Sequence, residues 1–276
     1  MVLPSDFQFS QSSLQDYVEC PWRFYLRHVR RLAWPAIVAE PALDHERHLL
    51  LGSEFHQLIH QHELEIPAEQ LSTVIGDPNL RGWWLNFLER GPGDVPELHH
   101  PEIVLSAPVS GYRLVAKYDL LAVDPARRAV ILEWKTYRQR RGRRWLDERL
   151  QTRVYPFLLV RAGAHLNEGR ALEPPQVEMV YWFAAFPDEP ERFLYGEKRY
   201  GEDGVYLHSL IEEIAGQTED EFQRTADEER CKFCSYRSLC QRGIRAGDFL
   251  QAEEVREAEE HLEIFLDFDQ IAEIEF

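Results

Sequence analysis

The four cysteines of this chain lie in two places that are far apart in the sequence. Cys20 is near the beginning, and Cys231, Cys234 and Cys240 form a C-x2-C-x5-C cluster near the end. Thiolates can bind one metal centre whatever their separation in the sequence, provided that they converge in space. Convergence here would join the two ends of the fold across the 210 residues that separate Cys20 from Cys231.

Disulfides or scattered buried thiols are the alternative to a metal site. Disulfides need an oxidising compartment. The N-terminal segment has neither a basic region nor an apolar run of the length of a signal peptide, and no stretch approaches the length of an apolar membrane span. We therefore expect a cytoplasmic protein without a membrane partner, in which reduced cysteines serve metal binding or catalysis.

Zinc and an iron-sulfur cluster both accept four thiolates, so the ligand count does not choose between them. Zinc sites more often combine two short C-x2-C pairs. One remote cysteine with a C-x2-C-x5-C triplet fits that pattern poorly. The spacing favours a 4Fe-4S cluster over zinc.

Charge is distributed unevenly along the 276 residues. The formal net charge of -17 argues against attraction to nucleic acid through global charge. Residues 252–276 contain ten acidic residues and one arginine, whereas residues 138–144 contain five arginines and no acid. An acidic average can therefore conceal a basic groove, although the arginine run can equally be a solvated loop that balances nearby acids.

The periodicity of apolar residues predicts an α/β chain, in which helices precede and follow a mixed sheet. Turn-forming residues in 66–101 mark an insertion around a short helix at Trp83 and Trp84. We expect one domain over 1–248 and an acidic extension over 249–276. The predicted helices cover 10–31 with a bend at Pro21, 44–65, 145–166 and 202–217, and the predicted strands cover 102–109, 112–124, 129–136, 177–186 and 192–195.

Charged residues emerge from the apolar strand that begins at Ala129. Side chains alternate across a strand, so Glu133 and Lys135 share one face and Trp134 takes the other. Asp119 would lie beside Glu133 if the register of the preceding hairpin allows it. Carboxylates suit Mg²⁺ or Mn²⁺, and an ammonium can orient a water and offset charge at a phosphate. A solvated strand is the alternative, but the apolar residues before Glu133 favour a buried site.

Five landmarks, in order, resemble the iron-sulfur branch of the PD-(D/E)XK nucleases, which includes RecB-like and AddB-like nuclease domains and CRISPR-associated exonucleases. The chain departs from the family in lacking a glycine three residues before Asp119 and in having Glu133 where aspartate is more frequent. The landmarks are Ser13-Leu14 with Tyr17, Cys20-Pro21 and Phe24-Tyr25; Gly52-Ser53-Glu54-Phe55-His56; Asp119; Glu133-Trp134-Lys135-Thr136; and Gln151-Thr152-Arg153-Val154-Tyr155, after which the cysteine triplet closes the series.

The resemblance implies a restriction-endonuclease-like mixed β-sheet flanked by helices, with its N- and C-terminal segments joined by the four-cysteine cluster. It implies metal binding by His56, Asp119, Glu133 and the backbone carbonyl of Trp134. Lys135 would position the water, and Gln151 and Tyr155 would contact substrate or orient the site. The arginines that would grip phosphates are Arg138, Arg140, Arg141, Arg143 and Arg144.

The implied activity is Mg²⁺- or Mn²⁺-dependent hydrolysis of DNA, by an exonuclease acting on single strands or processed ends in repair, recombination or defence. No G-x4-G-K-[ST] phosphate-binding loop occurs, so unwinding would need a helicase or another repair partner. The motifs by themselves do not distinguish an exonuclease from an endonuclease, or a DNA substrate from an RNA substrate. One rival hypothesis is a non-catalytic module that binds DNA ends or a partner and keeps a structural metal cluster. A second rival is a zinc protein of regulatory type.

Overall fold

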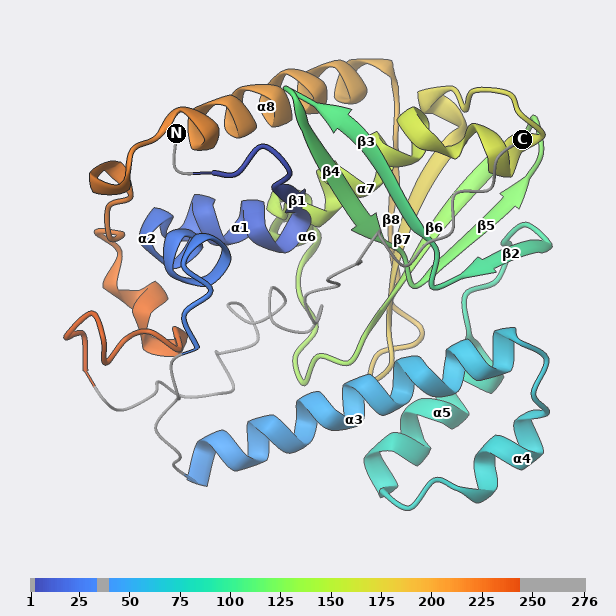
Figure 1. Cartoon of the computed structure of the whole chain (residues 1–276). Helices are drawn as coiled ribbons and strands as arrows, with labels where there is room; N and C mark the ends of the chain where they lie inside the picture. The colour runs from blue at the N-terminus through green and yellow to red at the C-terminus, as the bar shows by residue number, and fades with distance from the viewer. Residues whose placement is uncertain (1–2, 34–39, 244–276) are drawn as a thin grey trace.

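The computed structural model of the chain describes residues 3–33 and 40–243. Its main element is a mixed sheet of five strands in the order β2-β5-β6-β7-β8 (Figure 1). The central β6–β7 pair is parallel, and the other neighbouring strands are antiparallel. The expected mixed α/β architecture is confirmed. The strands are β2 (Leu98–Pro101), β5 (Leu120–Asp124), β6 (Arg128–Lys135), β7 (Val177–Phe183) and β8 (Glu191–Leu194).

A second sheet of three strands stands beside the first, in the order β1-β4-β3 (Figure 1). Its strands are β1 (Gln8–Ser10), β3 (Val104–Val109) and β4 (Tyr112–Lys117). The prediction of one strand over 112–124 was wrong, because the chain leaves the hairpin at Tyr118 and Asp119. Tyr118 N still donates to Ile103 O at 2.9 Å, but β5 then pairs with β6.

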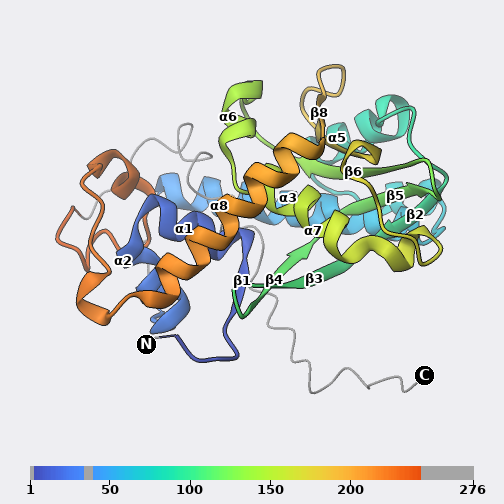
Figure 2. The same cartoon turned by 90° about the horizontal axis from the view of Figure 1, so that it is seen from above.

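Helices cover both faces of the five-stranded sheet. On β6 the side chains of Ala129 and Ile131 join the core that includes α7, whereas Val130, Leu132 and Trp134 join a second core with α3 and α5. Figure 2 shows α8 crossing the molecule beside α1. The helices are α1 (Gln11–Glu19), α2 (Pro21–Phe24), α3 (Glu40–Glu63), α4 (Ala68–Thr73), α5 (Pro78–Arg90), α6 (Arg143–Glu148), α7 (Gln151–Ala162) and α8 (Glu197–Gly216).

The helix predicted over 145–166 is divided into α6 and α7, which corrects that prediction. Arg149 has an extended backbone, with φ -74° and ψ 142°, and separates the two helices. Its side chain is buried and pairs with Glu19, which lies 130 residues earlier in the chain. A local pattern of apolar residues carries no information about such a distant partner. The break makes Gln151 the first residue of α7.

The segment expected to be an insertion, 66–101, forms α4, α5 and the edge strand β2. Its Trp84 is fully buried in the second core. Asn86 Nδ2 donates to Ala184 O at 2.7 Å, and Trp182 Nε1 donates to Arg90 O at 3.1 Å, so α5 is fixed to the end of β7. The acidic extension expected over 249–276 lies outside the described residues. Within the described ranges, no helix has both the length and the apolar character that crossing a membrane requires.

The N-terminal helix is held by a buried carboxylate, Asp16. Its Oδ1 lies 2.7 Å from Arg23 Nε, and its Oδ2 lies 2.8 Å from His28 Nε2 and 3.1 Å from Arg27 Nη1. Burial by itself raises the pKa of Asp16, but the charge of Arg23 and the contacts of His28 and Arg27 outweigh it. The pKa of this carboxyl therefore lies well below its usual range, and Asp16 is ionised at neutral pH.

Replacing this carboxylate should destabilise the fold in a pH-dependent way. Asp16→Asn should lower the free energy of unfolding at pH 7 by about 3 kcal/mol, because it leaves buried guanidinium groups without their counter-charge. Since the pKa is lower in the folded state, the stabilisation is present above the ordinary pKa of 3.8 and is lost as the pH falls below it. Urea unfolding of both proteins between pH 2 and pH 7 measures this. The exposed Asp6→Asn is the control, and a difference between wild type and Asp16→Asn that is independent of pH would contradict the assignment.

Candidate active site

Glu133 and Lys135 lie at the carboxyl end of β6, where the sequence predicted them to share a face. They continue the alternation that turns Ala129 and Ile131 toward α7, and Trp134 faces the opposite core. Both side chains are buried, Glu133 completely and Lys135 with 5% of its surface exposed. The alternative of a solvated strand face therefore does not describe this part of the structure.

Gln151 connects the two charged side chains. Its Nε2 donates to Glu133 Oε2 at 2.6 Å, and its Oε1 accepts from Lys135 Nζ at 2.9 Å. The ammonium also lies 5.5 Å from the centre of the Tyr181 ring. A primary amide can donate on one side and accept on the other, so one side chain satisfies an anion and a cation together. The first residue of α7 thus fixes the positions of both groups.

Asp119 immediately precedes β5 and reaches the end of β6. Leu120 pairs with Leu132 at the end of the antiparallel β5–β6 ladder, and the same register continued by one residue would set Asp119 opposite Glu133. Asp119 Oδ2 accepts a hydrogen bond from Trp134 N at 2.9 Å, so the carboxylate takes the place of a strand carbonyl. Its other oxygen, Oδ1, lies 3.2 Å from His56 Nδ1 on α3.

Helix α3 passes the end of β6 with three residues spaced four apart, His48, Gly52 and His56. His48 Nε2 lies 2.8 Å from Thr136 O. Burial, followed by the charge of Arg138, lowers the pKa of His48, so the neutral ring donates to this carbonyl. A Cβ atom on Gly52 would lie 2.9 Å from Thr136 Oγ1, so only glycine allows this approach. Sequence reasoning missed the positioning by His48, although its spacing from His56 places both on one helical face.

Tyr155 lies one turn after Gln151 on α7 and is buried against Tyr118, with 4.8 Å between ring centres. The Tyr118 hydroxyl donates to Tyr155 O at 2.9 Å. Burial, and then the charges of Glu133 and Asp119, raise the pKa of Tyr155 well above its ordinary value. Its hydroxyl therefore stays protonated, and it can act as a hydrogen-bond donor but not as a base at neutral pH.

One imidazole and two carboxylates form a donor set that suits a hard divalent cation. His56, Asp119 and Glu133 provide these donors, and Trp134, which follows Glu133 in the sequence, adds a backbone carbonyl. Within the part of the chain that the structure describes, however, no three His, Cys, Asp or Glu residues are arranged so that they could hold a metal ion. One oxygen of each carboxylate accepts a hydrogen bond instead, from Trp134 N and Gln151 Nε2.

The predicted phosphate-binding arginines follow β6, and most of them contact protein groups. Arg140 Nη2 lies 2.5 Å from Glu191 Oε1, and Arg143 Nη1 lies 3.3 Å from the other oxygen of this carboxylate. Arg144 pairs with Glu148 at 3.0 Å, and the Arg141 guanidinium lies 5.5 Å from the Trp145 ring centre. Arg138 is exposed near His48. These ion pairs correspond to the alternative in which the arginines balance nearby acids.

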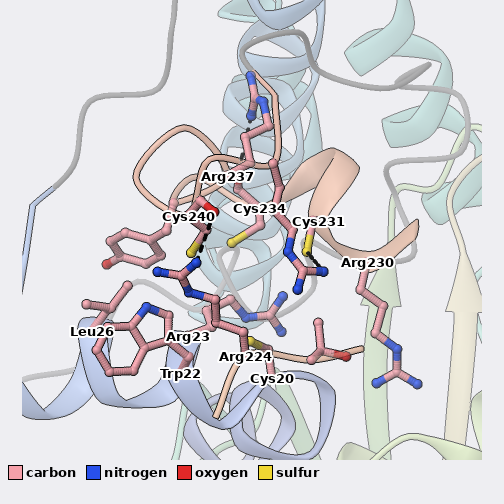
Figure 3. A pocket seen from close by; sticks show the side chains of 13 residues that line it. Cys20, Trp22, Arg23, Leu26, Arg224, Arg230, Cys231, Cys234, Arg237 and Cys240 are labelled. Atoms are coloured by element: carbon pink, nitrogen blue, oxygen red, sulfur yellow. Dashed lines mark hydrogen bonds between the residues drawn. The ribbon is translucent and has the colours of Figure 1, made fainter. Parts of the chain in front are cut away.

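The N- and C-terminal segments meet. Trp22 N donates to Gln223 O at 3.1 Å, and Phe222 stacks on Phe24 and Tyr25. Together the two segments line a pocket that all four cysteines share (Figure 3). Five arginines line it as well: Arg23, Arg224, Arg230, Arg237 and Arg242.

Three of the thiols in this pocket, those of Cys231, Cys234 and Cys240, are protonated at neutral pH because burial raises their pKa values. Burial raises the pKa of Cys234 to about 11, although the charge of Arg23 opposes the shift. Burial also raises the pKa of Cys231 and of Cys240. A metal must therefore displace protons to bind here. The donor set and the shared pocket suit a thiolate-bound metal, but among the described residues the cysteines are not arranged as a metal-holding group.

Comparisons with known proteins give one family match. Residues 8–241 match the family model described as PD-(D/E)XK nuclease superfamily. No curated protein matches the chain. Similar solved structures include the protein SSO0001, with 15% identity and a TM-score of 0.38 over 86% of this chain and 87% of that one. A candidate exonuclease from Eubacterium rectale has 11% identity and a TM-score of 0.48 over 76% of this chain and 80% of that one. At these TM-scores both resemblances are distant.

The close approach of α3 to β6 gives a prediction for Gly52. Gly52→Ala should lower the free energy of unfolding by about 1–3 kcal/mol, because the new methyl group overlaps Thr136 Oγ1, and this outweighs the gain in helix propensity. Thermal unfolding measures the loss. Thr136→Ala in the same chain should restore much of it. Gly82→Ala on α5, where nothing lies within 4 Å of a Cβ, is the matched control. Equal stability of Gly52→Ala and Gly82→Ala would contradict the steric argument.

Proposed function

The chain belongs to the PD-(D/E)XK nuclease superfamily, and from this premise we propose that it is a Mg²⁺- or Mn²⁺-dependent deoxyribonuclease. The observation that carries the proposal is the cluster at the end of β6. There Gln151 contacts the Glu133 carboxylate and the Lys135 ammonium, and Asp119 accepts a hydrogen bond from the backbone N of Trp134, which lies between them in the sequence. Two acids and an amine at one buried strand end are the groups that phosphodiester hydrolysis requires.

His56, Asp119, Glu133 and the carbonyl of Trp134 would hold the divalent cation. When bound, the cation supplies positive charge that polarises the phosphate and stabilises negative charge developing on it. Each carboxylate has two oxygens. Gln151 would keep its hydrogen bond to one oxygen of Glu133 and the Trp134 N–H its bond to one oxygen of Asp119, and the second oxygen of each carboxylate would bind the metal. The remaining donors suit Mg²⁺ or Mn²⁺ because they are carboxylate, carbonyl and imidazole groups.

The protein's own groups would orient the reactants. Lys135 Nζ would position the attacking water and offset charge at the phosphate, because a fixed ammonium in a buried site interacts strongly with a developing anion. Gln151 accepts a hydrogen bond from this ammonium and donates one to Glu133, so it would help to hold the two groups in a fixed relative position. Tyr155, which stays protonated, would donate a hydrogen bond to substrate or to the site.

For the cysteine pocket we propose a 4Fe-4S cluster bound by Cys20, Cys231, Cys234 and Cys240, with zinc as the less favoured metal. This would assign the chain to the iron-sulfur branch of its superfamily. The five arginines that line the pocket support the proposal, since a cluster with four thiolates carries net negative charge. Its role would be structural, because hydrolysis transfers no electrons. The nuclease domain would comprise residues 1–248, and 249–276 would be an acidic extension.

The proposed substrate is single-stranded DNA or DNA ends, cut exonucleolytically in repair, recombination or defence. Arg138, Arg143 and Arg144 are the exposed members of the arginine run. Arg140, Arg141, Arg143 and Arg144 would have to exchange the protein contacts described above for contacts with DNA. A helicase or another repair protein would provide unwinding, in the cytoplasm. The second candidate, a non-catalytic DNA-binding module, is favoured by the hydrogen-bonded state of both carboxylates.

The activity is tested with Glu133→Gln. This change keeps the size of the side chain but removes the proposed metal-binding charge, and it should lower Mg²⁺-dependent cleavage of end-labelled single-stranded DNA by about 100-fold or more. Lys135→Met should have a similar effect. Asp124→Asn, at the other end of the β5–β6 hairpin, is the matched control and should retain wild-type cleavage. If Glu133→Gln bound and cut DNA as wild type does, the site assignment would be wrong. If neither wild type nor Glu133→Gln cut DNA, the result would favour the non-catalytic binding module.

The cysteine pocket is tested by metal analysis of protein purified without oxygen. We expect about four iron and four sulfide ions per chain, and the visible absorption of thiolate-bound iron. Cys20→Ala and Cys234→Ala should both lose the iron, because ligands from both ends of the chain are required. Zinc without sulfide would select the alternative metal. A protein with four titratable thiols and no metal would overturn the metal proposal.

A further inference from the structure

A buried polar bridge connects the end of α1 to the start of α7. Glu19, the last residue of α1, accepts hydrogen bonds from Gln15 Nε2 at 2.9 Å and from Arg149 Nη1 at 3.1 Å. Gln15 Oε1 in turn accepts from the backbone N of Leu150 at 3.2 Å. The next residue is Gln151. Helix α1 therefore holds the backbone directly before the residue at the centre of the candidate active site.

The bridge is costly to bury. Glu19 and Arg149 have only 8% and 7% of their surfaces exposed, and removing charges from water costs several kcal/mol per ion even in a relaxed protein. Burial is the largest influence on the Arg149 guanidinium and lowers its pKa, while Glu19 opposes the shift. A well-packed apolar pair of similar size would stabilise the fold at least as well. What the ion pair adds is direction, since a guanidinium and a carboxylate have a defined relative geometry.

The bridge also explains where α7 begins. The extended backbone of Arg149 ends α6, and Leu150 and Gln151 start a new helix whose first side chain points to β6. If α6 continued into α7 as one helix, the axis of α6 would determine where the Gln151 side chain points. The position of the Gln151 amide therefore depends on the contacts that hold Arg149 and Leu150.

We propose that Glu19 and Arg149, with Gln15, are positioning residues that place the Gln151 amide between Glu133 and Lys135. The inference rests on the proposed nuclease function and deepens it, because it assigns the orientation of a catalytic group to a helix outside the sheet. The residues of the bridge act through Gln151 and do not touch the reacting groups.

A double-mutant cycle with Gln151→Ala tests this inference. Glu19→Gln and Arg149→Met should each lower kcat for single-stranded DNA by about 10- to 100-fold, the loss expected from misplacing a catalytic group, with less than a twofold change in KM. In the Gln151→Ala background neither change should lower kcat further, because the group they position is already absent. Arg149→Lys, which keeps the charge, should recover part of the loss.

Asp203→Asn is the matched control. Asp203 is also a buried acid that pairs with an arginine of α7, at 2.7 Å from Arg153 Nη1, but Arg153 is two residues after Gln151 and therefore on a different face of the helix. Asp203→Asn should lower Tm about as much as Glu19→Gln does and should leave kcat unchanged below the unfolding transition. If Glu19→Gln fails to fold, Gln15→Met carries the same test, since it removes the bond to Leu150 N and leaves no buried charge unpaired.

The outcomes separate this inference from the proposed function. A wild-type protein that does not cleave DNA overturns the function. If wild type is active, Glu133→Gln is inactive and Glu19→Gln has the kcat of wild type, only the positioning inference fails. Losses of Glu19→Gln and Gln151→Ala that multiply in the double variant also overturn it, because Glu19 would then have a purely structural role. The iron content of Glu19→Gln must equal that of wild type, since Arg23 contacts both Glu19 and the cysteine pocket.

Discussion

The Gln151 amide is the contact on which the candidate active site depends. It donates to Glu133 and accepts from Lys135, so it neutralises neither charge and fixes both. Each of these bonds involves one atom of the carboxylate or the ammonium. In the proposed mechanism the second oxygen of Glu133 would face a cation, and Lys135 would face a water. The remaining elements hold this amide against β6 from one side and bring His56 to Asp119 from the other.

The sequence was sufficient for the strand that carries the chemistry. The apolar residues before Glu133 indicated a buried strand, and alternation correctly placed Glu133 and Lys135 on one face. The position of Asp119 was left conditional on the register of the hairpin, and in the structure its carboxylate reaches this strand by accepting a hydrogen bond from Trp134 N. These features are local, because a strand has a fixed period and a hairpin has few registers.

What the sequence did not reveal depends on distant partners. The division of 112–124 between two sheets follows from pairing with β1 on one side and β6 on the other. The break at Arg149 depends on Glu19. The arginine run was ambiguous for the same reason, since its partner Glu191 lies about fifty residues away on β8. The cysteines are an exception, because their contact could be predicted in spite of their separation in the sequence. Four residues of one metal-binding type indicated that the two ends of the fold meet, whatever the fold of the residues between them.

The position of Cys20 directly after Glu19 has a consequence for the synthesis of this protein. At a translation rate of about 5–20 residues per second, Cys20 leaves the ribosome's catalytic centre roughly 10–40 seconds before Cys231 does. Throughout that interval Cys20 lacks the other cysteines of its pocket, and for the first part of it Glu19 lacks Arg149, with which it pairs in the folded protein. The segment that completes the pocket is thus made long after Cys20, and the pocket can close only when residues as late as Cys240 have been translated.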